Sequence, residues 1–459
     1  MAHVHRSRTV RTMGHAGGAA MPEPPALPRR LGTASATLVI VASMIGTGVF
    51  TTTGFLVRDL ASPGAILAGW LLGGALALAG ALCYAELSTA LPDNGGEFLL
   101  LSRIYHPAVG FVAGFVSLVV GFAAPAAAAA MACGRYLAVL WPALPQTGFA
   151  IALIAALGLV HALRVSTGSR LQNAVTAAQV ALIVLFVVAA LGASDGGQLA
   201  ARTEVPFFSA LMSPELAVGL IYISFSYSGW NAAVYLVGEI EEPARRLVRA
   251  SALGVVLTTC LYLALNFVFL ISAPAAELAG KVEVAAVAAQ ALLGNGARGF
   301  IVAVIGLGLF TSVSALIMTG PRVYEAMGQQ HARLRLLDRR VAGGGPCPAI
   351  ALQCGLSVLM ILGADVDALL SYCGLTLSLS AGLTALGVIV LRQREPGLAR
   401  PYKTWGYPLT PLCYGALTLW MVVHSVTGRP ASALAALATL GCGLLLYALV
   451  GSPQSTAAR

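Results

Sequence analysis

The chain has 459 residues, of which 58% are hydrophobic and only 10% are charged, and its formal net charge is +9. Soluble domains carry about 25% charged residues, so this composition excludes an ordinary water-soluble globular protein. The basic residues are spread over many loops without an aromatic platform, which argues against a nucleic-acid-binding protein.

Long apolar runs predict an all-α membrane protein, because a run of about 20 residues crosses the hydrocarbon core as a helix. Residues 1–32 are expected to be a disordered cytosolic tail, with either Met1 or Met21 as the true start. About twelve spans follow, at 33–57, 63–90, 107–138, 147–163, 170–193, 214–239, 249–273, 298–327, 348–364, 366–391, 409–428 and 431–451.

The distribution of basic residues predicts the orientation of these spans. With a cytosolic N-terminus, the inner segments hold 21 lysines and arginines and the outer segments hold six. Cytosolic loops are the ones enriched in basic residues. We therefore expect a multi-pass protein of the cell (inner) membrane, with both termini in the cytosol.

Two spans contain glycine and small hydroxyl residues near their centres, at Ala42–Phe50 and at Ser224–Asn231. Glycine frees the backbone to unwind, although small residues also serve close helix packing. The two interrupted spans are the first of two five-helix sets, 33–193 and 214–391, with two further helices at 409–451. Because five is odd, the second set is inverted. Glycine-interrupted helices at matching places in an inverted repeat predict a binding site at mid-membrane.

Broken helices present unpaired backbone groups to a ligand. The amides of Gly46, Thr47 and Gly48 suit an anion such as an α-carboxylate. Nearby carbonyls suit an α-ammonium, so a zwitterion fits both. The spans supply no ionisable side chain at midplane depth, which predicts a substrate without a strongly charged side chain. The expected substrate-binding residues are Met44, Ile45, Gly46, Thr47, Gly48, Phe225, Ser226 and Ser228.

Five motifs, in order from residue 33 to about 428, resemble the amino acid–polyamine–organocation (APC) permeases, which have the leucine-transporter type of fold. The motifs are Ser43–Phe50; Tyr84–Leu87 with Pro92 and Gly95–Phe98; Phe225–Asn231 with Gly238–Ile240 and Pro243; Gly320–Met327; and Arg400–Lys403 with Gly406–Pro408. The resemblance implies secondary transport of amino acids by alternating access. It assigns Gly46, Thr47 and Gly48 to the substrate carboxylate. It assigns the Phe225 ring to a gate, and the amino group to the carbonyls of Met44, Phe225, Ser226 and Ser228.

One position departs from the family pattern. Many members carry a lysine in the fifth helix where this chain has Gln179, and a glutamine cannot give up a proton. This coupling position therefore leaves symport, exchange and uniport open. A vacant lysine position also makes a sodium site conceivable, with ligands from Ala42, Ile45, Thr311 and Ser312.

Three alternatives compete with an amino-acid permease. They are a permease for another small amine or a polyamine, a transporter-like sensor that binds an amino acid, and an intramembrane enzyme. We expect no enzyme and no cofactor, because the loops lack catalytic motifs. The expected partners are a small-molecule substrate, namely an amino acid, together with the lipid bilayer and a proton or sodium ion. The identity of the amino acid, the coupling ion and the oligomeric state stay open.

Overall fold

The computed structural model describes residues 32–60, 62–91, 96–163, 169–194, 205–232, 237, 240–340 and 345–451, and these are helical without strands. The proposed tail falls outside this part of the chain, as do the motif residues Pro92, Gly95, Gly238 and Glu239. For residues 169–176 and 326 the backbone alone is described.

The first half of the chain builds a broken first helix followed by four further helical rods. Its elements are α1 (Thr33–Met44), α2 (Thr47–Asp59), α3 (Pro63–Ala90), α4 (Gly96–Ile104), α5 (Pro107–Val116), the π-helix η1 (Ser117–Ala123), α6 (Ala124–Ala138), α7 (Gln146–Leu163) and α8 (Ser169–Ala193). The elements α5, η1 and α6 are continuous and form one span of 32 residues. A π-helix in this span, just before Pro125, adjusts the backbone where proline removes a hydrogen bond.

Further helices follow in the second half of the chain, and the expected inverted repeat of the first half stays a prediction. These helices are α9 (Phe207–Leu211), α10 (Pro214–Ser226), α11 (Pro243–Ser272), α12 (Ala275–Leu278), α13 (Val284–Gln330), the 3₁₀-helix η4 (Ala332–Asp338), α14 (Cys347–Gly363), α15 (Val366–Arg394), α16 (Leu409–Gly428) and α17 (Pro430–Val450).

The lengths of these helices confirm a multi-pass membrane protein. Among the described residues, eight helices are long and apolar enough to cross a membrane, or nine if α1 and α2, bent by 45°, form one span. Shorter apolar helices at Ala177–Ala193, Pro214–Ser226 and Cys347–Gly363 lie at the other three expected spans. The total of twelve spans stays a prediction.

Several helices extend beyond the apolar runs that predicted them. The helix α13 begins at Val284 rather than at residue 298, and its two pieces meet at Gly294, where φ is 83°. The helices α11 and α15 also continue into charged turns, since α11 begins at Pro243 and α15 ends at Arg394. Hydropathy marks the part of a helix inside the hydrocarbon and does not mark the turns that project into water.

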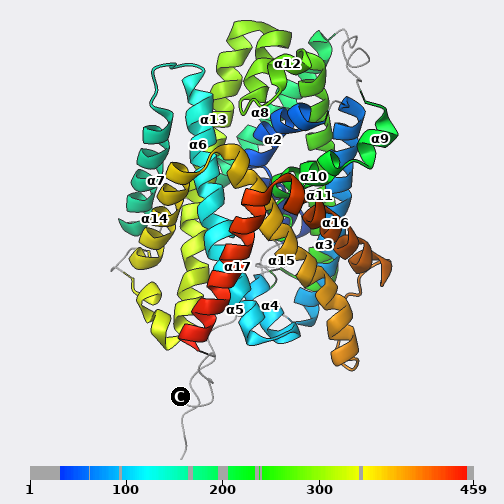
Figure 1. The fold of residues 1–459 in the computed structure, drawn as a ribbon, viewed down its shortest axis with the longest axis vertical. Helices are drawn as coiled ribbons and strands as arrows, with labels where there is room; N and C mark the ends of the chain where they lie inside the picture. The colour runs from blue at the N-terminus through cyan, green and yellow to red at the C-terminus, as the bar shows by residue number, and fades with distance from the viewer. Residues whose placement is uncertain are drawn as a thin grey trace, which may run out of the picture.

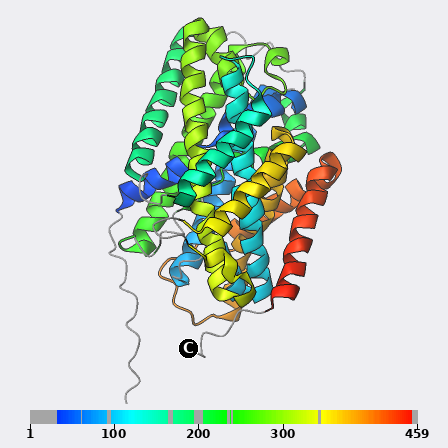
Figure 2. The ribbon, with the colours of Figure 1, turned by 90° about the vertical axis from the view of Figure 1, so that its left-hand side faces the viewer.

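The broken helix α1–α2 lies inside the bundle, against α10, α11 and α13 (Figure 1). The helices α3 and α11 pack together, as do α6 and α13. The outermost helices carry exposed leucines, for example Leu359 on α14 and Leu437 on α17. The red helix α17 stands at the front in Figure 1 and at the edge of the bundle in Figure 2. These exposed apolar faces match a surface that contacts lipid.

Candidate functional site

The first helix is broken where the sequence predicts. The helix α1 ends at Met44 and α2 begins at Thr47, while Ile45 and Gly46 between them are extended. No side chain caps the N-terminus of α2. The first amides of a helix have no partner within it, so this end of α2 is suited to receive an anionic group.

The sixth helix is also interrupted at the predicted place. The helix α10 ends at Ser226, and a turn follows in which the amide of Ser228 donates to the carbonyl of Phe225 at 2.9 Å. Gly229 has φ of 103°, a conformation that favours glycine. The ring of Phe225, the expected gate, is buried.

The two breaks contact each other. A Cβ atom on Gly48 would lie 2.5 Å from the Cα of Ser226, and one on Gly229 would lie 2.3 Å from the carbonyl oxygen of Ser43. These two glycines are therefore required by close packing of the two halves. Gly46 differs, because a Cβ there would find its nearest neighbour, the Ser312 hydroxyl, at 4.0 Å.

The hydroxyl of Tyr262, on α11, joins the two breaks. It lies 2.6 Å from the carbonyl oxygen of Met44 and 3.0 Å from that of Ser226, and the side chain is fully buried. A hydroxyl has one hydrogen and can donate to only one of them at a time. Sequence reasoning missed this residue, although a tyrosine and an asparagine inside the apolar run 249–273 were a usable signal.

Hydrogen bonds from three neighbouring helices hold α2 in place. The Tyr136 hydroxyl on α6 donates to the carbonyl of Phe50 at 2.8 Å. The hydroxyls of Thr52 and Ser226 lie 3.0 Å apart. Thr53 donates to Asn266 of α11. These buried contacts fix the position of α2 and therefore the direction of its N-terminal amides.

The expected coupling position lies between α8 and α13. Gln179 is buried and packs directly on Gly308, where a Cβ would come within 1.9 Å of the Gln179 Nε2. Of the residues proposed for sodium, Thr311 donates its hydroxyl to the carbonyl of Gly308 at 2.9 Å, as hydroxyls in helices often do. Ser312 lies beside the first break. Whether sodium binds to Ala42, Ile45, Thr311 and Ser312 stays a prediction.

Charged residues meet at the end of the bundle that the charge bias places outside. Arg58 bonds both Asp59 at 2.7 Å and Asp367 at 2.9 Å, and Arg429 reaches the same two carboxylates at 3.0 and 3.3 Å. We call these four residues the outer ion cluster. Tyr222 of α10 also donates to Asp367. The cluster therefore ties α2 and α10 to α15 and to the junction of α16 and α17.

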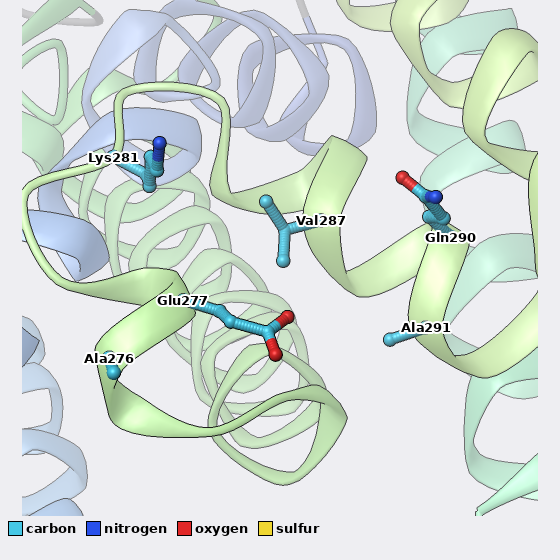
Figure 3. Close-up of a pocket in the computed structure, with 6 residues that line it drawn as sticks. All are labelled: Ala276, Glu277, Lys281, Val287, Gln290 and Ala291. Carbon is cyan, nitrogen blue, oxygen red and sulfur yellow. The ribbon is translucent and has the colours of Figure 1, made fainter.

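A wide cavity lies nearby, between α12 and α13, with a volume of about 670 Å³ (Figure 3). Its polar groups come from Glu277, Lys281 and Gln290. The loop on its rim contacts α2, because the amide of Gly280 donates to the carbonyl of Gly54 at 2.7 Å. The cavity adjoins the outer half of the broken helix and includes none of the residues at the breaks.

A buried carboxylate anchors the opposite end. Glu86 on α3 is 1% exposed and receives two hydrogen bonds from Arg392, at 2.8 and 2.7 Å, and one from the amide of Thr404 at 2.6 Å. The Arg392 guanidinium lies 3.8 Å above the ring of Tyr407. Glu86 belongs to the second of the five motifs. Arg392 lies near the end of α15, before the fifth motif.

Glu97, at the start of α4, reaches further into the bundle than its sequence position suggests. Its carboxylate accepts hydrogen bonds from Tyr84 at 2.7 Å, from Asn231 at 3.3 Å and from Ser380 at 2.6 Å. Ser380 lies at the middle of α15, and Asn231 follows the second break. Glu97 lies outside the expected spans, so the expectation that the spans supply no ionisable side chain at midplane depth did not cover this inward-packing carboxylate.

Comparison with known proteins agrees with this architecture. The family model described as amino acid permease matches residues 31–457. The chain is 27% identical to "Large neutral amino acids transporter small subunit 2" of Mus musculus, over 97% of this chain and 86% of that protein. It is 28% identical to "Asc-type amino acid transporter 1" of Mus musculus, over 88% of this chain and 78% of the relative.

A third relative, "b(0,+)-type amino acid transporter 1" of Homo sapiens, is 27% identical over 89% of this chain and 85% of its own length. The family match covers nearly the whole chain, including both breaks and both charged ends. The chain therefore belongs to the amino acid permease family.

Proposed function

We propose that this protein moves amino acids with neutral side chains across the cell membrane by alternating access, with both termini in the cytosol. The observation that carries the proposal is the contact between the two helix breaks. It brings the uncapped amides of α2 next to the carbonyls of Met44 and Ser226. The three relatives are named as transporters of amino acids, which supports the same substrate class.

The substrate carboxylate is proposed to bind the amides of Gly46, Thr47 and Gly48. Its ammonium group is proposed to bind the carbonyls of Met44 and Ser226 and to replace the Tyr262 hydroxyl there. An ammonium has three hydrogens and can satisfy both carbonyls at once, which a single hydroxyl cannot do. Ile45 completes the first break, Phe225 and Ser228 complete the second, and the Phe225 ring covers the bound molecule.

The mode of transport is proposed to be exchange or uniport. Gln179 stands at the coupling position, packed on Gly308, and has no proton to release. The Thr311 hydroxyl donates to the Gly308 carbonyl, an ordinary contact for a hydroxyl in a helix, and this contact gives no separate indication of sodium. A polyamine substrate would need several acidic groups at the breaks, and the described break residues supply none.

Uptake measurements on purified protein in proteoliposomes test the proposed function. Vesicles preloaded with unlabelled leucine should take up external radiolabelled leucine and should not take up radiolabelled putrescine. Exchange should proceed with potassium in place of sodium and without a pH gradient. Failure of every neutral amino acid to exchange or bind would overturn the proposed substrate class. A strict requirement for sodium would instead overturn the proposed mode and favour the candidate sodium site.

A further inference from the structure

An apolar cavity of about 240 Å³ lies among the ends of several helices, far in sequence from the breaks. Its ten lining residues come from α5, η1, α13, η4, α14 and α17, and include Phe115, Met327, Leu337, Leu356 and Leu446. Packed interiors hold few voids larger than a water molecule. Even an apolar cavity of roughly 150 Å³ is large enough to bind a benzene-sized molecule.

The cavity offers nothing to a polar ligand. Tyr324 brings the one hydroxyl among the described lining residues, and that hydroxyl is already within reach of the Leu118 carbonyl at 3.2 Å and of Gln353 at 3.3 Å. All other lining side chains are leucine, valine, phenylalanine or methionine. The occupant must therefore present a hydrocarbon surface.

The short helix η4 forms one wall of the cavity and also carries basic residues. Leu334 and Leu337 line the cavity, whereas Arg333 and Arg335 are exposed, and Arg339 follows directly. Arg333 donates to the carbonyl of Leu449. Within the part of the chain that the structure describes, the side chains of Arg335 and Arg339 form no ion pair or hydrogen bond.

The neighbouring Arg340 already has a partner and is therefore not free to bind an anionic ligand. It binds Glu325 through two hydrogen bonds, and these raise the pKa of its guanidinium. Among the described residues, two arginines without a side-chain partner thus lie close in sequence to the leucines that line the cavity. A ligand that satisfies both features has a hydrocarbon chain next to an anionic group.

The depth of the cavity indicates where such a ligand comes from. Met327 lies three residues before the end of α13, Leu446 four before the end of α17, and Phe115 eight after the start of α5. At 1.5 Å per residue, these positions are roughly 5 to 12 Å from the helix ends. The positive-inside bias places those ends in the cytosol, where the leaflet carries anionic lipids.

We propose that an anionic phospholipid of the cytosolic leaflet binds here, with an acyl chain in the cavity and its phosphate on Arg335 and Arg339. The lipid contacts α13, which also carries Gly308, Thr311 and Ser312, so it joins the surrounding bilayer to the helix beside the first break. This inference rests on membrane embedding and cytosolic orientation. It does not depend on which amino acid is carried.

Native mass spectrometry of the full-length protein in detergent tests the site. The protein is titrated with dioleoyl phosphatidylglycerol or with dioleoyl phosphatidylcholine. The wild-type protein should retain phosphatidylglycerol in preference to phosphatidylcholine. Arg335→Gln with Arg339→Gln should weaken that binding by about ten-fold or more, because basic residues near the surface attract anionic lipid. Leu356→Trp, which fills the cavity and leaves the charges, should weaken binding of the same lipid.

The matched control is Arg245→Gln with Arg249→Gln, which removes two exposed charges at the same cytosolic side from the start of α11. This pair should leave phosphatidylglycerol binding unchanged. An equal loss for both arginine pairs would mean diffuse attraction to the basic face and would overturn the site. Equal retention of the two lipids by wild type would overturn the choice of an anionic head group. Unchanged binding in Leu356→Trp would overturn the placement of the acyl chain.

Discussion

Tyr262 places a hydroxyl where the amino group of a substrate is expected to bind. Replacement by phenylalanine leaves the carbonyls of Met44 and Ser226 without this donor, and a buried unpaired polar group costs about 1–3 kcal/mol. A bound ammonium would restore both partners. Tyr262→Phe should therefore be less stable without substrate and should gain more from leucine than wild type does.

Thermal unfolding of purified protein, with and without leucine, measures this difference. Tyr324→Phe is the control, because the Tyr324 hydroxyl is equally buried and donates to the carbonyl of Leu118 at 3.2 Å, outside both breaks. Its shift in Tm on adding leucine should match that of wild type. A smaller leucine shift in Tyr262→Phe would exclude the proposed exchange of hydroxyl for ammonium.

Gly46 and Gly48 have different neighbours and should respond differently to alanine. At Gly48 the added methyl group meets the backbone of Ser226, so Gly48→Ala should lower the Tm by several degrees. At Gly46 the methyl group has ordinary space in the protein but lies where a carboxylate would approach the backbone. Gly46→Ala should fold normally and lose ten-fold or more in exchange activity. Normal exchange by folded Gly46→Ala would refute the carboxylate assignment.

The positions of the helices could be predicted because apolar length is a local property of the sequence. The expected bounds of α3 and α16 agree with the structure to the residue. The breaks near Met44 and Ser226 were also predictable, since glycine and hydroxyl residues weaken a helix locally. The contact of Gly48 with Ser226 was not, because it depends on how two distant segments pack.

Side-chain partners across elements were the least predictable part of the site. Tyr262 lies 218 residues from Met44 in sequence, and Glu97 lies 283 residues from Ser380. Tyr262 stands out as a polar residue within its apolar run, but nothing in the sequence indicates the partner of either residue. The sequence could only mark Glu97 as part of a motif, and the depth of its carboxylate follows from the packing of α4 against α15.

Glu97 holds α4 to α3, to the segment after the second break and to α15. If opening toward the cytosol separates these elements, Glu97→Gln should favour the open form, because hydrogen bonds to a charged acceptor are the stronger ones. A cysteine at Ser228, in a background without the exposed native cysteines, should then react at least two-fold faster with an impermeant maleimide added on the cytosolic side.

Glu395→Gln provides the comparison for this experiment. Glu395 pairs with Arg103 of α4, whose side chain is 61% exposed, and exposed ion pairs contribute little to stability. Labelling at Ser228 should not change in that variant. Equal acceleration in both variants would mean that any lost charge near α4 loosens this end, and would remove the special role of Glu97.

The whole bundle is tied at both ends, by the outer ion cluster on one side and by the Glu86 and Glu97 contacts on the other. The proposed alternating access would require these two sets of contacts to open in turn. Asp367→Asn weakens the contacts of this residue with Arg58, Arg429 and Tyr222 at the same time. It should therefore increase the labelling of a cysteine at Ser228 by maleimide added from outside. Glu277→Gln, in the neighbouring cavity, should not. No change from outside in Asp367→Asn would exclude the cluster as an outer closure.

The outer ion cluster contains two arginines and two aspartates, so its formal charges cancel. Opening that separates these charges within the plane of the membrane moves no charge through its electric field. The opening rate should therefore be nearly independent of membrane potential. The exposed edges of the cluster are reached by ions, and added salt screens such pairs over about 10 Å at 0.1 M. The opening rate of a protein closed in this way would depend on the ionic strength of the surrounding solution and not on the membrane potential.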